Sequence, residues 1–207
     1  MKYLKKSILL TLCFFVSFVV SAKDTEDQAA LQKILATFTS YSAKFEQTIS
    51  NAMGEELQKS SGTIALGKPS KLRWQVTYPD ESLLIADGES VFNIDPFVEQ
   101  VTILGQEDVI ATNPLSLLIT NDKDAWQSVK VEKSGDFFVV WSTDPQASVK
   151  AVKLSFDQNN RLTNLVATDA QGQINDIAFS DIKVNPMLSL NTFIPEIQDS
   201  YEIDDQR

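Results

Sequence analysis

The most constraining feature of this sequence is a hydrophobic period of two residues that begins after Ser40. In the segment 71–78 the alternation is unbroken, with Leu72, Trp74 and Val76 separated by charged and polar residues. Successive side chains of a β-strand point to opposite faces of the sheet. This segment is therefore predicted to be a strand with one buried and one solvated face.

Similar strand signals recur along the chain, and turn-forming pairs such as Asp87-Gly88 and Gln171-Gly172 separate them. Short connections between successive strands indicate antiparallel hairpins. We therefore predict a mainly β fold, a long curled antiparallel sheet of about eleven strands. The expected strands span 41–49, 61–67, 71–78, 82–87, 90–95, 98–104, 128–133, 136–143, 148–156, 161–168 and 173–184.

A helix is predicted ahead of the first strand. Thr25 and Gln28 have the spacing of a capping box, and an apolar stripe follows at helical spacing from Leu31 to Phe38. A second, short helix is predicted inside the interruption between about 105 and 127, where Asn113-Pro114 precedes an apolar segment. These helices must cover one side or the mouth of the sheet.

Residues 1–22 have the pattern of a secretory signal peptide, with a basic start, an apolar run of about 14 residues and a small-residue exit at Ser21-Ala22. The apolar run is shorter than the ~20 residues that a membrane-spanning helix needs. We expect cleavage after Ala22, which removes the only cysteine, Cys13, and leaves 15 basic against 28 acidic residues. No repeat or flexible linker follows, so 23–207 is predicted to be a single domain.

The composition excludes several classes of function. Histidine is absent, which removes Ser-His-Asp triads, Cys-His pairs and imidazole-bound zinc. The formal charge of −10 argues against nucleic-acid binding. The segment from Gly62 to Lys68 starts like a phosphate-binding loop, but Pro69 stands where Ser or Thr is needed. No cofactor and no metal is expected.

Aromatic residues remain as a surplus at strand positions, among them Phe45, Trp74, Phe92 and Phe138. A sheet of this many strands must curl or close, and folds of this kind can hold an apolar ligand inside. The alternative interpretation is that these side chains only fill a core.

Particular stretches, taken together and in order over the mature chain, are similar to the LolA family of periplasmic lipoprotein carriers. The matching stretches are Gly62 to Trp74 with Lys68-Pro69, Pro79 to Gly88, Asp95 to Val101, Asn113-Pro114 with Leu117-Leu118, Phe193-Ile194-Pro195, and the ending Asp204-Asp205-Gln206-Arg207. The middle stretch and the terminus are the most specific.

The resemblance implies an unclosed barrel of eleven antiparallel strands whose apolar cavity, under a lid of helices, shelters the acyl chains of lipoproteins. It also implies a monomer that receives cargo from an ATP-driven inner-membrane transporter and delivers it to a LolB-like outer-membrane acceptor. The family usually has an arginine that tethers the lid where this chain has Lys68. We expect the acyl-chain cavity to be lined by Phe45, Leu72, Trp74, Val76, Ile85, Phe92, Leu115 and Leu118.

Three other functions stay open at this point. A general periplasmic lipid carrier would share the cavity but would not transfer a protein cargo. A carboxylate-dependent hydrolase needs two facing acids, and most acid pairs here, such as Asp80/Glu81, lie at predicted turns. An outer-membrane barrel is disfavoured because bacterial single-chain barrels have even strand numbers. We therefore predict a carrier and not an enzyme.

Overall fold

The computed structural model describes residues 21–110, 118–119 and 124–207. Twelve strands of the described residues form one sheet. Their bounds are β1 (Ser40–Ser50), β2 (Glu56–Gly67), β3 (Lys71–Tyr78), β4 (Ser82–Ala86), β5 (Ser90–Asp95), β6 (Gln100–Gly105), β7 (Val129–Ser134), β8 (Phe137–Ser142), β9 (Val149–Phe156), β10 (Leu162–Asp169), β11 (Ile174–Val184) and β12 (Glu202–Asp205).

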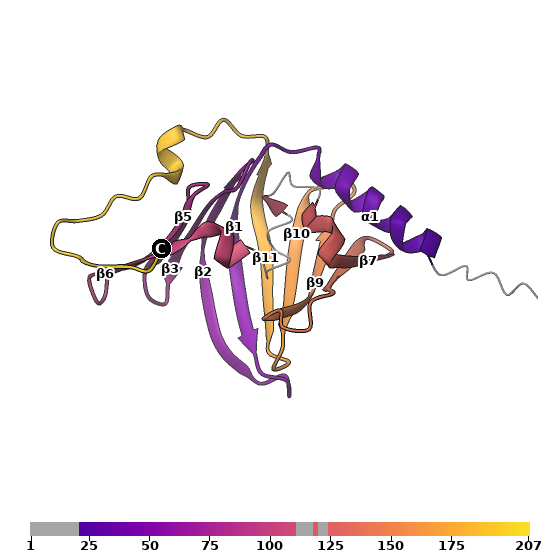
Figure 1. The fold of residues 1–207 in the computed structure, drawn as a ribbon, viewed down its shortest axis with the longest axis horizontal. Coiled ribbons are helices and arrows are strands. Elements are labelled where there is room, and N and C mark those ends of the chain that lie inside the picture. The colour runs from indigo at the N-terminus through magenta and orange to yellow at the C-terminus, as the bar shows by residue number, and fades with distance from the viewer. Residues whose placement is uncertain (1–20, 111–117, 120–123) are drawn as a thin grey trace, which may run out of the picture.

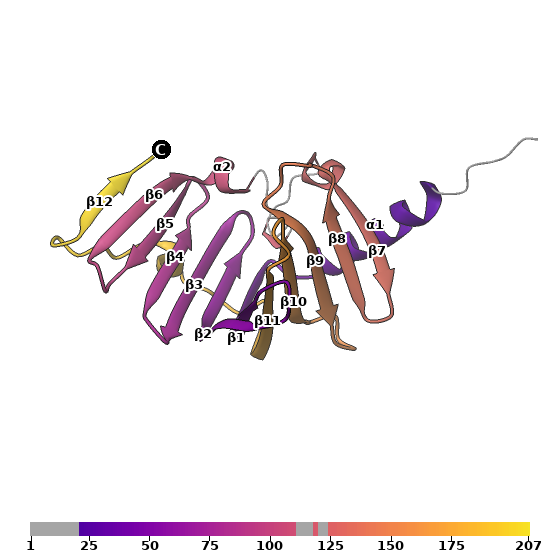
Figure 2. The same cartoon turned by 90° about the horizontal axis from the view of Figure 1, so that it is seen from below.

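The strand order is β12-β6-β5-β4-β3-β2-β1-β11-β10-β9-β8-β7, so β1 and β11 join the two halves at the centre. The sheet curls strongly, and β12 and β7 form its two separate edges (Figures 1 and 2). The prediction of an unclosed, mainly β architecture is confirmed.

All eleven predicted strands are present, most with bounds within two residues of those expected. The clearest difference among them is β2, which begins at Glu56 because it continues the β1 pairing along a polar stretch that shows no alternation. The additional strand is β12, which pairs with β6 in parallel. The expectation that every strand is antiparallel is therefore wrong for the C-terminal tail.

The helical elements are α1 (Ser21–Leu35), α2 (Gln106–Ile110) and the 3-10 helices η2 (Asp124–Ser128) and η3 (Leu190–Phe193). Helix α1 already includes Thr25, so the predicted cap at that position is wrong; Ala22 and Lys23 are good helix formers and extend the helix. The predicted helix at Asn113-Pro114 lies outside the described residues, apart from Leu118 and Ile119. Among the described helices, none has the length and apolar character required to cross a membrane.

Helix α1 packs against the edge strand β7. Leu31 and Leu35 are buried in the main core, and the Asp27 carboxylate accepts a hydrogen bond of 2.9 Å from the backbone N–H of Lys133. An edge strand exposes backbone groups that could pair with another chain. Helix α1 covers this edge and satisfies one of its donors.

The sheet has two faces with different partners. The cavity face carries Leu72 and Trp74 and belongs to the main core. On the outer face, a second cluster formed by Ile94, Val101 and Ile103 is covered by Ile197 and Tyr201 from the C-terminal segment.

Candidate functional site

An apolar cavity of about 330 Å³ lies against the cavity face of the sheet. Most of its wall consists of aliphatic and aromatic side chains from β1–β5, β10 and β11, and α2 and the pair Leu118-Ile119 complete it. The lining residues are Tyr41, Gln47, Ile64, Leu66, Leu72, Trp74, Leu84, Ala86, Val91, Gln106, Val109, Leu118, Ile119, Leu162, Leu165, Asn175, Ile177 and Phe179.

Strand register explains why this wall is apolar. Cross-strand partners share a face, and the pairing aligns Leu66, Leu72, Ala86 and Val91 in one row across four strands. The next row holds Ile64, Trp74 and Leu84. The alternation in each strand therefore adds up to a continuous hydrophobic surface.

The floor of the cavity is stiffened by an aromatic pair. The rings of Phe45 and Trp74 stack with centroids 3.9 Å apart, although β2 lies between their strands. Gly62 of β2 has no side chain at this point, and a Cβ atom there would lie 3.0 Å from the Phe45 ring. Phe45 is buried beside Trp74 and does not itself line the cavity.

The cavity wall outside the sheet is held by hydrogen bonds through Ser70 and Gln106. The backbone N–H of Ser70 donates to the Ile119 carbonyl at 2.9 Å, and Gln106 Nε2 donates to the Ser70 carbonyl at 2.7 Å. Gln106 Oε1 also accepts from the Gly88 N–H, and the Gln106 side chain is buried. One amide thus joins α2, the β2–β3 turn and the β4–β5 turn.

Lys68 lies at the end of β2 and reaches the C-terminus of α1. Its Nζ donates to the Leu35 carbonyl at 2.6 Å and lies 4.4 Å from the centroid of the Phe38 ring. A cation at this end of a helix satisfies a free carbonyl and interacts favourably with the helix dipole. Burial lowers the pKa of Lys68.

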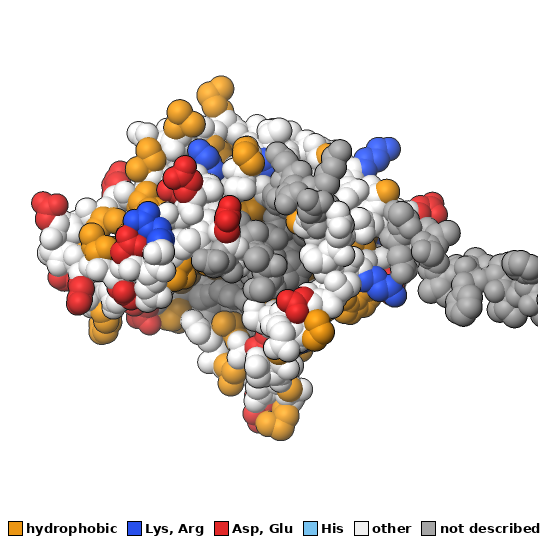
Figure 3. All heavy atoms as spheres, viewed as in Figure 1, with side chains coloured by type: hydrophobic (Ala, Val, Ile, Leu, Met, Phe, Trp, Pro, Cys, Tyr) orange, Lys and Arg blue, Asp and Glu red, His pale blue; other side chains and the backbone are white. Residues whose placement is uncertain are grey.

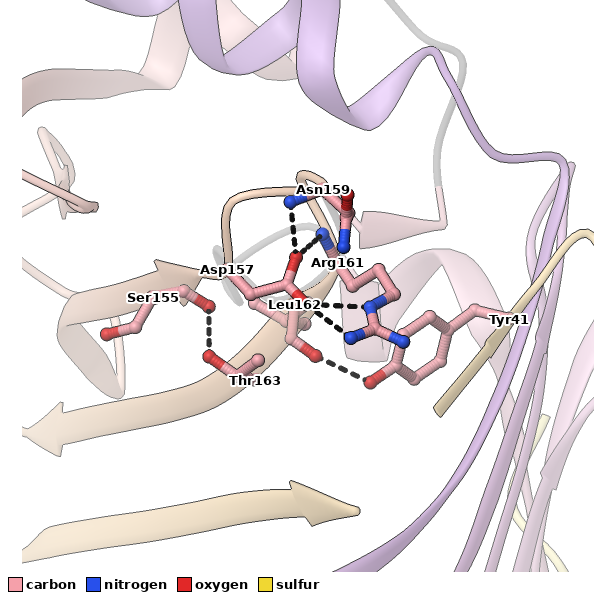
Figure 4. A network of polar contacts seen from close by, with 7 residues as sticks. All are labelled: Tyr41, Ser155, Asp157, Asn159, Arg161, Leu162 and Thr163. Atoms are coloured by element: carbon pink, nitrogen blue, oxygen red, sulfur yellow. Dashed lines mark hydrogen bonds and ion pairs between the residues drawn. The ribbon is translucent and has the colours of Figure 1, made fainter. Parts of the chain in front are cut away.

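Tyr41 crosses the cavity face as an uncharged phenol (Figure 4). Its hydroxyl donates to the Leu162 carbonyl at 2.8 Å, and burial raises its pKa. In the adjoining turn the Asp157 carboxylate accepts from both the backbone and the guanidinium of Arg161. The Tyr41 bond holds β1 to β10, and the described residues that line the cavity include no Asp, Glu, Lys or Arg.

A second hollow of about 360 Å³ adjoins the first at Gln47, and we call it the polar groove. It differs from the cavity in having carboxylates in its wall. Its lining residues are Gln47, Gln58, Ser60, Val76, Pro79, Asp80, Glu81, Ser82, Asp95 and Phe97. Figure 3 shows further acidic side chains grouped over the part of the molecule that carries β5, β6 and β12.

The chain matches the family model described as outer membrane lipoprotein carrier protein LolA over residues 36–196. The chain belongs to the LolA family. A relative from Aeromonas salmonicida, named outer-membrane lipoprotein carrier protein, is 35% identical over 205 residues, covering 99% of this chain and 100% of the relative. A relative of the same name from Pseudoalteromonas translucida is 36% identical over 193 residues, covering 92% of each chain.

The resemblance to the LolA family stated from the sequence is thereby confirmed. Among solved structures, an uncharacterized conserved protein from Thermus thermophilus superposes with a TM-score of 0.54 at 12% identity, over 86% of this chain and 99% of that one. This likeness supports the fold.

The structure places the predicted LolA-type cavity residues in different settings. Leu72, Trp74 and Leu118 line the cavity, and Phe45 lies directly beside Trp74. Val76 shares their face but lines the polar groove. Leu115 lies outside the described residues. Contact of any of these side chains with acyl chains stays a prediction.

Ile85 and Phe92 do not line the cavity, which corrects the prediction for both. Ile85 pairs with Arg73 and Phe92, so all three point to the outer face. Phe92 packs against the second cluster, and Ile85 is fully buried. Both faces of β4 and β5 are apolar, and hydrophobicity alone does not distinguish the inner face from the outer one.

Several lining residues of this LolA-family cavity were not predicted. Tyr41 and Leu66 follow the same alternation as Phe45 and could have been found by extending it along β1 and β2. Leu162 and Leu165 are three residues apart because a register shift interrupts β10, so a strict alternation misses one of them. Gln106 carries no sequence signal, since its role comes from backbone groups distant in the chain.

Proposed function

We propose that this LolA-family protein is a periplasmic carrier that shelters the acyl chains of lipoproteins in the apolar cavity and delivers them toward the outer membrane. The observation that carries the proposal is a wall made almost wholly of hydrophobic side chains, with no Asp or Glu among its described lining residues. Carrier relatives of full length support the same function. The lack of facing acids in this wall gives no support to the hydrolase alternative.

The energetics of acyl chains in water require such a shelter. Each exposed methylene costs about 0.8 kcal/mol, so a free lipoprotein would stay in its membrane or aggregate. The cavity of about 330 Å³ is at the small end of the ~300–1,000 Å³ of ordinary ligand pockets. Three acyl chains together are larger than the single drug-sized ligand that a pocket of this volume holds. We therefore infer that loading enlarges the cavity.

The elements that can move to enlarge the cavity are those that take no part in the hydrogen bonding of the sheet. Enlarging the cavity through the sheet would break many backbone hydrogen bonds, whereas Leu118-Ile119 is joined to the β2–β3 turn by the Ser70 bond. The cost of displacing such groups keeps the affinity finite, which a carrier needs in order to release its cargo. We infer that Lys68 stabilises the closed arrangement by holding the end of α1.

The partners in this proposal are acylated lipoproteins, an ATP-driven inner-membrane transporter that loads the carrier, and a LolB-like acceptor that unloads it. The protein acts as a monomer, without cofactor or metal, after removal of residues 1–22. With 15 basic against 28 acidic residues, its net charge of −13 is unfavourable for adsorption to anionic membranes and supports free diffusion between them.

The test is a release assay with the mature protein. Inner-membrane vesicles that carry the transporter and labelled lipoproteins are incubated with ATP, with or without the carrier, and the supernatant is separated by size. We expect a soluble complex that depends on both ATP and the carrier and passes its label to acceptor-bearing vesicles. Release of free lipid without lipoprotein would favour a general lipid carrier, and no soluble label at all would contradict the proposal.

A further inference from the structure

Gln47 lines both hollows and marks the boundary between them. On the cavity face of β1 it follows the buried residues Tyr41, Ala43 and Phe45 at the same two-residue spacing. It is the first polar residue in that series. A molecule with its hydrocarbon in the cavity and its head in the polar groove would pass this side chain.

A directed chain of hydrogen bonds crosses three strands at this boundary. Ser60 Oγ donates to Gln47 Oε1 at 2.8 Å, and Gln47 Nε2 donates to Asn175 Oδ1 at 2.8 Å. Ser60 is buried and lines the groove, while Asn175 lines the cavity. Each of the two amide oxygens accepts one hydrogen bond, and the donors left over in the chain are amide N–H groups: the second hydrogen of Gln47 Nε2 and both hydrogens of Asn175 Nδ2.

These donors have no partner among the described residues. Asn175 Nδ2 makes no hydrogen bond to any residue in the ranges 21–110, 118–119 and 124–207. A donor beside an apolar cavity favours a ligand that brings an acceptor, because a desolvated N–H without one is costly. Ester and amide carbonyls at the heads of acyl chains are neutral groups that only accept.

The charges around the boundary favour a neutral head over a phosphate. No Lys or Arg is among the described residues that line either hollow, whereas Asp80, Glu81 and Asp95 line the groove. Phosphate recognition normally uses cations or helix N-termini, and carboxylates repel it. Backbone N–H groups of a peptide, by contrast, can donate to carboxylates.

We propose that the Gln47–Asn175 amide pair binds the carbonyl groups at the head of the acyl chains, with the polar groove receiving the peptide that follows. The site thereby selects acylated peptides over anionic phospholipids of equal chain length. This proposal depends on the carrier function proposed above and adds to it the basis of cargo selection.

The experiment compares three ligands with two palmitoyl-length chains each. They are an N-acetylated diacylglyceryl-cysteinyl peptide with ester linkages, its dialkyl ether analogue, and dipalmitoyl phosphatidylglycerol. Affinity for the mature protein is measured by displacement of an apolar fluorescent dye. We expect the ester peptide to bind about three- to thirtyfold more tightly than the ether analogue, as one or two neutral hydrogen bonds allow. The phospholipid should bind more weakly than the ester peptide.

Two variants test whether the preference for the ester peptide depends on the Gln47–Asn175 amide pair. Asn175→Leu and Gln47→Leu should remove the preference for the ester, so that each variant binds the ester peptide no more tightly than it binds the ether analogue. Gln75→Leu is the matched control, since Gln75 neighbours Trp74 on β3 and points to the outer face. It should keep the full preference. Dye binding also verifies that each variant has folded with its cavity intact.

The outcomes separate the two proposals. If the wild type binds the dye but neither peptide, the carrier function fails. If both peptides bind with equal affinity, or Asn175→Leu retains the preference, the carbonyl site is overturned while the carrier function stands. If phosphatidylglycerol binds as tightly as the ester peptide, the selection against anionic heads is overturned.

Discussion

Gly62 shows how one position without a side chain shapes the cavity wall. A Cβ atom at this position would lie 1.9 Å from the Gln75 carbonyl oxygen and 3.0 Å from the Phe45 ring. Any larger residue must displace backbone, because the Gln75 carbonyl of β3 approaches Gly62 closely beside a register shift. The first glycine of the apparent phosphate-loop pattern therefore has a steric explanation.

Gly62→Ala is expected to lower the free energy of unfolding by about 2–3 kcal/mol or more, since the overlap is with backbone and not with a flexible side chain. Urea denaturation followed by circular dichroism measures the change. Ser61→Ala on the same strand is the control and should stay within about 0.5 kcal/mol of the wild type. Equal midpoints for the two variants would show that β3 can move away at little cost.

Leu72→Glu places a carboxylate on the cavity wall, where the described surroundings are apolar. We expect affinity for an acylated peptide to fall on the order of tenfold or more, because the charge must be desolvated when chains enter. Gln75→Glu adds the same charge to the outer face of the same strand and should leave binding unchanged. Unaltered binding by a folded Leu72→Glu protein would place the acyl chains elsewhere.

At the scale of elements, alternation and turn residues were sufficient to predict eleven strands, because each carries its signal within a few residues. β12 carries none: Ile203 is its only large apolar residue and is exposed. The strand forms because its backbone pairs with β6, some hundred residues earlier in the chain. Pairings of this kind come from tertiary structure, which a local pattern does not contain.

The Asp205–Arg207 pair predicts a pH dependence for β12. Hydrogen bonds from the Arg207 side chain and backbone lower the pKa of Asp205 to about 2. The folded pKa is below the ordinary value of about 3.9, so the stabilisation is present above pH 4 and is lost as the pH falls toward 2. The Gln206 amide, which donates to the Ile103 carbonyl at 2.8 Å, reports on this pairing.

The measurement is an NMR titration of the Gln206 amide from pH 6 to 2. In the wild type, its chemical shift should stay native-like to lower pH than in Arg207→Gln, where the guanidinium no longer lowers the pKa of Asp205. Because the pair is exposed, added salt should reduce the difference between the two proteins. Coincident titration curves at low salt would show that the ion pair does not support β12.

At the scale of the whole molecule, the sequence predicted that a cavity exists more reliably than it predicted which residues face it. Leu72 and Trp74 alternate with charged and polar residues along their strand, so their side was determined by the alternation. Ile85 and Phe92 lie in strands with apolar residues on both faces. Their orientation follows from the sheet register, and the C-terminal segment joins Phe92 in the cluster on the outer face. The two-residue period of a strand does not show which of its faces a distant segment of the chain will cover.

Cargo loading should open the cavity at the contact between Ser70 and Ile119. The described lining divides into strand residues, fixed by ladder hydrogen bonds, and the residues of α2 and the pair Leu118-Ile119, which lie outside the ladder. Expansion to hold several acyl chains should therefore break the 2.9 Å bond from the Ser70 N–H to the Ile119 carbonyl. That amide becomes free to exchange with solvent when the bond opens.

Hydrogen exchange followed residue by residue, with and without bound acylated peptide, tests this movement. We expect the Ser70 amide to exchange at least severalfold faster in the loaded protein. The Lys68 amide is the matched control, because it donates to the Thr39 carbonyl at 2.8 Å in the same turn but does not touch the cavity wall. If Ser70 stays as protected as Lys68 after loading, the space for cargo must come from the sheet, and the two halves that meet at β1 and β11 would have to move apart.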